Sequence, residues 1–196
     1  MLQLRGLNIR MSSTRGSKRD NVKQQKIIQT ILRKDNPKKV GILMGSPNDY
    51  TKMKEAKYML DTLGIQNEIQ VLSAHRQPQE VAELSKNARE NGYVAFICGA
   101  GMAAHLAGAV SSQTTLPVVG VPLSGSALNG VDALYATVQM PKGIPVATVA
   151  IDNSTNAALL VAEMIAITDN TIHEKLEIIR TKTRDQYNDI ELPKSE

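Results

Sequence analysis

The chain has 196 residues, of which 42% are hydrophobic and 21% are charged, as expected of one globular domain with a buried core. It contains no Trp and a single Phe, so the core must consist mainly of aliphatic side chains. The single cysteine, Cys98, excludes an internal disulfide and favours a reducing cytoplasm. We expect no membrane span and no signal peptide, because no apolar run approaches the roughly 20 residues that a span needs.

The net charge of +4 is unevenly distributed. Residues 1–40 hold eleven Lys and Arg against two Asp, whereas residues 41–196 hold twelve Lys and Arg against seventeen Asp and Glu. The basic segment could be a nucleic-acid arm or an organellar presequence, but we expect a solvated extension, or sequence upstream of a start at Met11. We therefore expect no nucleic-acid partner.

The chain divides into three parts by this pattern. Residues 1–38 are expected to be a basic extension, flexible or partly helical, with a short helix over 22–32. Residues 39–187 are expected to form a single catalytic α/β domain, and residues 188–196 a tail.

Strands and helices alternate along the predicted domain. Short apolar or alternating runs predict strands, and apolar residues at three- and four-residue spacing predict helices. The predicted strands cover residues 40–44, 65–73, 93–98, 117–123 and 145–151. The predicted helices cover residues 53–63, 81–88, 102–112, 131–138, 157–167 and 171–187, and Gly64 is the expected stop of the first.

This alternation predicts an α/β fold with right-handed crossovers and a parallel sheet covered on both faces. Five strands indicate a three-layer αβα, flavodoxin-like architecture with the strand order 2-1-3-4-5. The last helix carries Ile172, Leu176 and Ile179 on one stripe, although the helices that cover the sheet are already accounted for. We expect this extra C-terminal helix to pack on a neighbouring subunit.

Three loops that follow predicted strands should meet at the carboxyl edge of the sheet, where ligands bind in open α/β folds. The second of these loops is Ser73-Ala74-His75-Arg76, just before Pro78, which suits the first turn of a helix. An imidazole with a pKa near 6.5 can both give and take a proton at neutral pH. His75 is therefore a candidate acid–base residue, and the alternative is a structural histidine.

The loop after the first strand combines a tight turn with helix-capping residues. Gly45 permits the turn, and Ser46 and Asp49 have the spacing of a capping box. This loop has two interpretations: a helix cap alone, or a site where exposed amides hold a phosphate. Without a Walker lysine we exclude nucleoside triphosphate hydrolysis. A nucleoside monophosphate fits better, with Ser46 and Arg76 on the phosphate and Asp49 on the ribose hydroxyls.

The loop after the third strand, Gly99-Ala100-Gly101, is a weak match to a dinucleotide fingerprint. Its glycines instead predict close approach of a flat ligand ring, with amides offered to a carboxylate. His105 is expected inside the helix over 102–112, where packing is favoured over ligand contact. Cys98 is expected to be a buried apolar residue. The three histidines are too scattered for a metal site, so we predict neither a metal nor a cofactor.

Several motifs in unbroken order resemble the N5-carboxyaminoimidazole ribonucleotide mutases, class I of the AIR carboxylase family. The resemblance runs from about residue 40 to residue 187. The motifs that carry it are MGSPND (44–49), SAHR (73–76), GAGMAAHL (99–106), GVD (130–132), VQMP (138–141) and NAALL (156–160).

The resemblance implies an octameric, cytoplasmic isomerase of de novo purine (IMP) biosynthesis, coupled to an ATP-dependent, carbamate-forming synthetase. A carboxylate moves from the exocyclic nitrogen of the small-molecule ribonucleotide substrate to C4 of the imidazole, through loss and recapture of CO2. His75 occupies the position of the acid–base residue. The positions implied to bind the substrate are Gly45, Ser46, Asn48, Asp49, Ser73, Ala74, Arg76, Gly99, Ala100, Gly101, His105 and Leu106.

Two other functions are compatible with the same fold: a carboxylase that uses free CO2 and a non-catalytic nucleotide-binding module. The carboxylase class usually carries lysine after the histidine, where this chain has Arg76. The chain departs from the mutase pattern at a few positions. These are Asn48 for the common serine, Tyr50 for tryptophan, Met102 for glycine, Ala107 for proline, and Ser124-Gly125-Ser126 for a Gln-Ser-Ala-like run.

Overall fold

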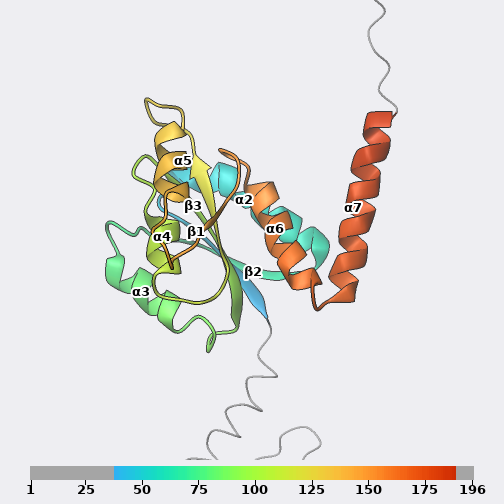
Figure 1. The fold of residues 1–196 in the computed structure, drawn as a ribbon, viewed down its shortest axis with the longest axis horizontal. Helices are drawn as coiled ribbons and strands as arrows, with labels where there is room; N and C mark the ends of the chain where they lie inside the picture. The colour runs from blue at the N-terminus through green and yellow to red at the C-terminus, as the bar shows by residue number, and fades with distance from the viewer. Residues whose placement is uncertain (1–37, 189–196) are drawn as a thin grey trace, which may run out of the picture. The chain divides into compact units, whose positions relative to one another are not determined.

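The computed structural model describes residues 38–188 and confirms the predicted α/β fold (Figure 1). Parallel strands form a five-stranded sheet in the predicted order, β2-β1-β3-β4-β5. The strands are β1 (Lys39–Met44), β2 (Gln66–Val71), β3 (Tyr93–Gly101), β4 (Val118–Leu123) and β5 (Ala147–Thr148). The helix predicted over 22–32, the basic extension up to residue 37 and the tail from residue 189 lie outside the described residues.

Helices cover both faces of the sheet (Figure 1). One face is covered by α2 (Tyr50–Leu63) and α6 (Ser154–Ala166), with the short 3₁₀ turn η1 (Pro47–Asp49) just before α2. The other face is covered by α3 (Pro78–Lys86), α4 (Leu106–Ser111) and α5 (Val131–Val138). A last helix, α7 (Asn170–Asn188), packs on α6 and α2. Between residues 38 and 188, no helix is both long and apolar enough to cross a membrane.

The core consists of two clusters, one on each side of the sheet. Val40, Ile42 and Leu60 belong to the cluster beneath α2 and α6, and Leu43 and Phe96 to the cluster beneath α3 and α4. Nearly all members are aliphatic, as the composition predicts. Strands buried on both faces explain the continuous apolar runs of β1 and β4 in the sequence.

Two helix boundaries follow the local rules that predicted them. Pro78 lies in the first turn of α3, where its missing N–H removes no intrahelical hydrogen bond. Gly64 ends α2 in the left-handed conformation, at φ 74°, and donates its N–H to the carbonyl of Asp61.

The third strand and the following helix differ from the prediction at the glycine motif. β3 continues through Gly101, because its backbone stays paired with β4 as far as Leu123. The helix predicted from residue 102 begins only at Leu106. Met102 has a φ of 53°, a left-handed conformation that an α-helix cannot contain. His105 therefore precedes α4 instead of lying inside it.

The fifth strand is much shorter than predicted, because β4 cannot pair with a longer one. The carbonyls of Gly120 and Pro122 accept hydrogen bonds from Val149 and Asp152, so the even-numbered residues of β4 face β5. Pro122 has no N–H to donate on that side. Regular pairing accordingly ends at Thr148.

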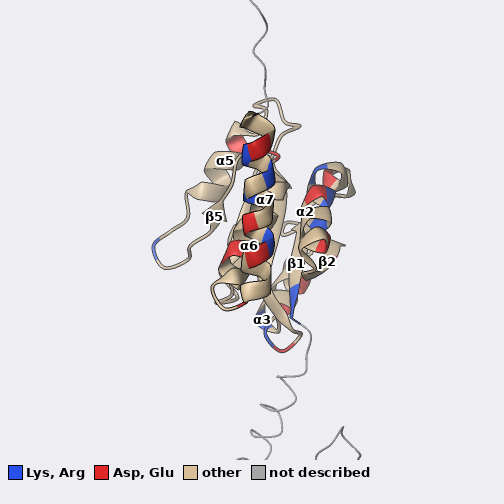
Figure 2. Cartoon of the chain, turned by 90° about the vertical axis from the view of Figure 1, so that its right-hand side faces the viewer, with Lys and Arg blue, Asp and Glu red and all other residues tan. Residues whose placement is uncertain are grey.

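The apolar stripe on α7 is mostly buried within the chain itself. Ile172 and Leu176 are each 6% exposed and belong to the core cluster beneath α2 and α6, and Ile179 packs against it. The prediction that this stripe packs on a neighbouring subunit is therefore wrong for Ile172 and Leu176. Lys175 fixes the helix further by donating to the Leu63 carbonyl at 2.6 Å. The outer face of α7 carries charges of both signs (Figure 2).

Substitution of Leu176 by alanine tests this packing within the chain. Leu176→Ala should lower the free energy of unfolding by about 2–4 kcal/mol, because it leaves a cavity in the core. Ile178→Ala is the matched control on the same helix, since Ile178 is 53% exposed, and should change the free energy by less than about 0.5 kcal/mol. Urea denaturation at two protein concentrations separates unfolding from subunit dissociation. Equally small losses for both variants would contradict the packing.

Candidate active site

Backbone hydrogen bonds bring the carboxyl ends of β2, β1 and β3 side by side. The N–H of Leu72 donates to the carbonyl of Met44 at 2.8 Å, and the N–H of Gly45 donates to the carbonyl of Gly99 at 3.2 Å. The three loops predicted to form a site therefore start from adjacent points of one sheet edge.

The first loop forms the predicted capping box. The hydroxyl of Ser46 accepts from the N–H of Asn48 at 3.3 Å, and the carboxylate of Asp49 accepts from the N–H of Ser46 at 3.0 Å. Burial raises the pKa of Asp49, while the hydrogen bond from Ser46 and the charge of Lys52 act in the opposite direction. The cap is confirmed, and phosphate binding by the same loop stays a prediction.

The second loop is anchored at one end and open at the other. Ser73 is buried, and its carbonyl accepts from the N–H of Gln77 at 2.8 Å, while its own N–H donates to the Gln77 side chain at 3.3 Å. Ala74 packs against the core cluster beneath α3 and α4. His75 and Arg76 are exposed. The anchored residues therefore present an imidazole and a guanidinium outside the packed core.

The third loop places its glycines against other parts of the same chain. A Cβ on the buried Gly99 would collide with the sulfur of Met53 on α2, and one on Gly101 would lie 3.2 Å from the carbonyl oxygen of Leu123. Ala100 is half-buried. The absence of side chains at 99 and 101 is thus explained by packing. The approach of a flat ligand to these residues stays a prediction.

His105 and His75 face each other across the second and third loops. The distance from His75 Nε2 to His105 Nδ1 is 2.7 Å, and the rings meet edge to face with centroids 4.8 Å apart. The expectation that His105 packs inside a helix is wrong, because it precedes α4 and is exposed. One ring nitrogen of the contact donates and the other accepts, and the tautomers of the two rings decide which does so. The next residue, Leu106, is 2% exposed and packs in the core.

Three polar residues at the far half of the same edge were not among the predicted site residues. Lys52 in the first turn of α2 contacts Ser124, which follows β4, and Asp152, which follows β5. Their positions after strands are a signal that could have marked Ser124 and Asp152 as candidates. Their contact with Lys52 has no signal in the sequence, because Ser124 lies 72 residues away.

Cys98 is buried, as predicted. Burial raises the pKa of its thiol far above the usual range, so the group stays neutral and takes no part in nucleophilic chemistry. Among residues 38–188, no three His, Cys, Asp or Glu side chains lie together in a way that could hold a metal ion. The imidazoles of His75 and His105, by contrast, are exposed at this edge.

A parallel sheet in the order 2-1-3-4-5 with helices on both faces defines a flavodoxin-like α/β protein. Comparison with known families identifies the family within this class. The AIR carboxylase family matches residues 39–186, and the chain belongs to it.

Individual relatives agree with this assignment. An N5-carboxyaminoimidazole ribonucleotide mutase of Pyrococcus horikoshii is 53% identical over 137 residues, which cover 70% of this chain and 77% of that protein. The enzyme of the same name from Escherichia coli K12 is 43% identical over 155 residues, covering 78% and 92%. The crystal structure of Treponema denticola PurE superposes with a TM-score of 0.69 at 27% identity, covering 76% of this chain and 93% of that one.

Alanine at position 99 tests whether the glycine is needed for packing. Gly99→Ala should destabilise the fold by about 1–3 kcal/mol, because Met53 is fully buried and cannot move away without strain. Gly45→Ala is the control, since its Cβ would meet only an Asp49 oxygen at 4.0 Å, and it should change stability by less than about 0.5 kcal/mol. Thermal and urea unfolding measure both variants. A Gly99→Ala protein as stable as Gly45→Ala would contradict the packing explanation.

Proposed function

We propose that the chain is an N5-carboxyaminoimidazole ribonucleotide mutase, an isomerase of de novo purine biosynthesis on the route to IMP. Relatives with this printed name match most of the chain. The observation that carries the proposal within the molecule is the contact between His75 and His105 at the edge where three loops meet. An acid–base reaction at neutral pH needs such a group and needs no metal.

Exposed groups around the imidazole pair suit a nucleoside monophosphate. Arg76 offers a guanidinium that can bind a phosphate with two hydrogen bonds, and Ser46 and Asn48 lie in the loop that caps η1. We assign to the Asp49 carboxylate the hydrogen bonds from the ribose hydroxyls. The migrating carboxylate is assigned to the backbone amides of residues 99–101.

The proton route follows from the two rings. His75 protonates the exocyclic nitrogen of the substrate, and the N–CO2 bond breaks to release CO2 and the free amine. Carbon C4 of the imidazole then attacks the retained CO2, and His75 accepts the proton that C4 loses. His105 Nδ1 lies at hydrogen-bond distance from Nε2 of His75. It can take or supply a proton at this nitrogen, which is not the one that acts on the substrate. The proton is therefore used and returned within one turnover, which requires no cofactor.

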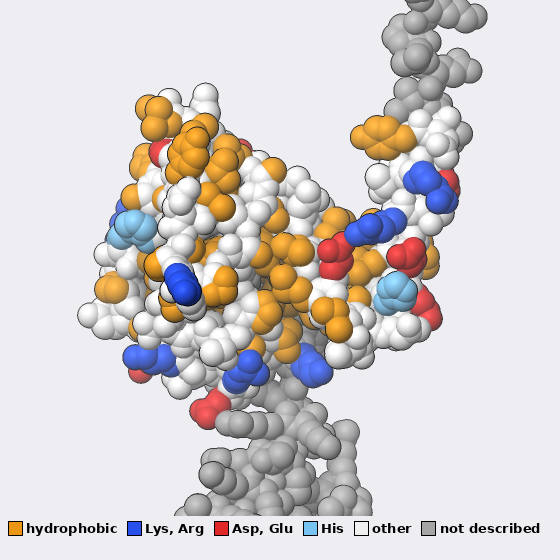
Figure 3. All heavy atoms as spheres, in the orientation of Figure 1, with side chains coloured by type: hydrophobic (Ala, Val, Ile, Leu, Met, Phe, Trp, Pro, Cys, Tyr) orange, Lys and Arg blue, Asp and Glu red, His pale blue; other side chains and the backbone are white. Residues whose placement is uncertain are grey.

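The assembly and the supply of substrate complete the proposal. Figure 3 shows apolar side chains gathered over α5, where Val131, Tyr135 and Val138 are exposed at helical spacing. An exposed apolar stripe of this kind supports contact between copies of the chain, and we propose an octamer, as the resemblance to the mutases implies.

An ATP-dependent, carbamate-forming synthetase supplies the substrate in the cytoplasm, where the free thiol of Cys98 stays reduced.

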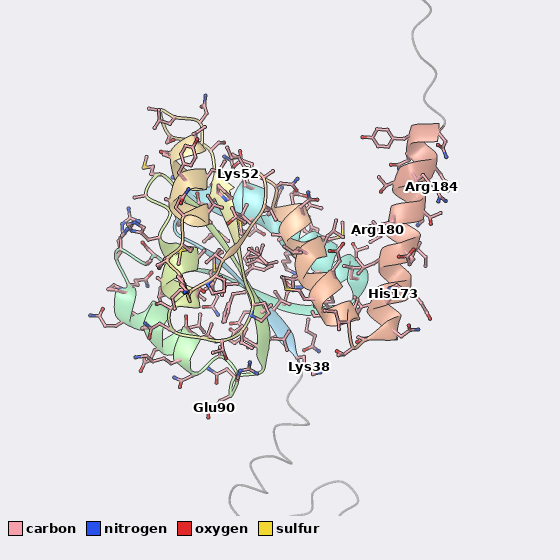
Figure 4. The ribbon with its side chains drawn as sticks, in the orientation of Figure 1. Lys38, Lys52, Glu90, His173, Arg180 and Arg184 are labelled. Carbon is pink, nitrogen blue, oxygen red and sulfur yellow. The ribbon has the colours of Figure 1, made fainter. Side chains whose placement is uncertain are left out.

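Replacement of His75 by asparagine tests the acid–base role. His75→Asn should lower turnover by at least about 10²-fold, since the amide cannot transfer the proton, while folding and substrate binding are kept. His173→Asn is the matched control, because His173 lies exposed on α7 (Figure 4) and should leave turnover unchanged. Steady-state kinetics and equilibrium binding separate the two effects. Near-normal turnover of His75→Asn would overturn the mechanism.

The choice of carboxyl donor tests the function as a whole. The protein is given aminoimidazole ribonucleotide either with high bicarbonate alone, or with low bicarbonate, ATP and a carbamate-forming synthetase. Rapid C4-carboxylated product should form only when the synthetase is present. Equally rapid product from bicarbonate alone would make the chain a carboxylase that uses free CO2. The absence of product in both reactions would favour a binding module.

A further inference from the structure

Three polar side chains from distant parts of the sequence form a closed cluster beside the proposed substrate site. The Nζ of Lys52, labelled in Figure 4, lies 2.5 Å from the hydroxyl of Ser124 and 2.9 Å from the carboxylate of Asp152. The Ser124 hydroxyl donates to the other carboxylate oxygen of Asp152 at 2.5 Å, and the Ser124 N–H donates to Asp152 at 2.8 Å. Each of the three side chains therefore contacts both of the others.

The cluster is also tied to the backbone on both sides. The hydroxyl of Ser154, at the start of α6, donates to the carbonyl of Lys52 at 2.5 Å. The N–H of Asp152 donates to the carbonyl of Pro122 on β4 at 2.9 Å. Lys52 additionally donates to the carbonyl of Ser124 at 3.0 Å. These bonds join the first turn of α2 to the loops that follow β4 and β5.

The charges of the cluster exclude a nucleophilic serine. A serine next to a lysine acts as a nucleophile when the lysine is neutral and can accept its proton. Here burial raises the pKa of Asp152, but the hydrogen bonds from Ser124 and Lys52 outweigh it and keep the pKa low. The carboxylate is therefore ionised, and it forms an ion pair with the Lys52 ammonium at 2.9 Å. The arrangement is suited to fixing positions and not to covalent chemistry.

The backbone at Asp152 is strained in a way that needs such fixing. Its φ is 59°, and the other non-glycine residues of the described chain with positive φ are Met102 and Asn129. They lie in the loops after β3, β4 and β5, at the carboxyl edge of the sheet. Strained residues persist only where the surroundings hold them, and they concentrate at functional sites.

We propose that Lys52, Ser124 and Asp152 act as positioning residues, which we call the α2 clamp, and that they set the affinity for the nucleotide substrate. Lys52 is three residues after Asp49, so the clamp fixes the start of α2 and with it the capping box of Ser46 and Asp49. The charge of Lys52 also acts on the Asp49 carboxylate. The inference rests on the proposed placement of phosphate and ribose on that capping box.

Steady-state kinetics of clamp variants in the full chain test this inference. Lys52→Met and Asp152→Asn should each raise KM about 5- to 10-fold and leave kcat within about twofold, because the clamp fixes the binding loop and not the imidazoles. The double variant should raise KM no more than either single variant, since both remove the same contact. Lys57→Met is the control, because Lys57 forms a 2.6 Å pair with Asp61 on the same helix and should leave KM unchanged.

Three further variants separate the clamp from the substrate site. Ser46→Ala and Arg76→Ala should raise KM if the substrate lies where we place it. Raised KM in these variants, with unchanged KM in Lys52→Met and Asp152→Asn, would overturn the clamp alone. Unchanged KM in all of them would overturn the substrate placement and the clamp together. Asp152→Gly removes the carboxylate and relieves the strained φ, so wild-type KM in that variant would also overturn the clamp.

Discussion

The hydrogen bonds that join the carboxyl ends of β2, β1 and β3 are the constraint on which the site depends. They continue the sheet past the last strand residues, from Leu72 to Met44 and from Gly45 to Gly99. Three loops therefore begin on neighbouring strands, with the loop after β1 between those after β2 and β3, although 27 residues or more separate them in the chain. Two histidines on different loops can then approach to 2.7 Å without either loop crossing the core.

Close packing between the helices and the sheet fixes the distance between the start of α2 and the edge of the sheet. Three strand glycines leave room for side chains that pack against the backbone. A Cβ would collide with Phe96 at Gly41, with Met53 at Gly99 and with Thr137 at Gly120. Side chains from α2 and α5 thus reach the strand backbones. In an interior packed to crystal-like density, such contacts allow little displacement. The start of α2 and its capping box are consequently held at one distance from the sheet edge.

At the far half of the edge, an ion pair also holds the start of α2 in place. Surface ion pairs such as Lys57 with Asp61 contribute roughly 0–1 kcal/mol, because water screens them and both side chains lose freedom. The pair of Lys52 and Asp152 differs, since the Ser124 hydroxyl contacts both partners, and the backbone carbonyl and N–H of Ser124 bond Lys52 and Asp152 respectively. This pair mainly fixes positions, because it links the first turn of α2 to the loops that follow β4 and β5.

The sequence by itself determined the elements and their order, because a parallel α/β sheet leaves a strong period in the chain: buried apolar strands, amphipathic helices, and glycine or proline at helix ends. It also determined the capping box and the first two strand-end loops, which depend on residues close together in the chain, whereas residues 99–101 belong to β3. Only the tertiary structure decided that β5 ends at Thr148, that Leu176 packs within its own chain, that His105 meets His75, and that Lys52 meets Asp152. Each of these features depends on a residue from a distant segment, such as Pro122 for β5. A local sequence pattern does not predict which distant residue will make the contact.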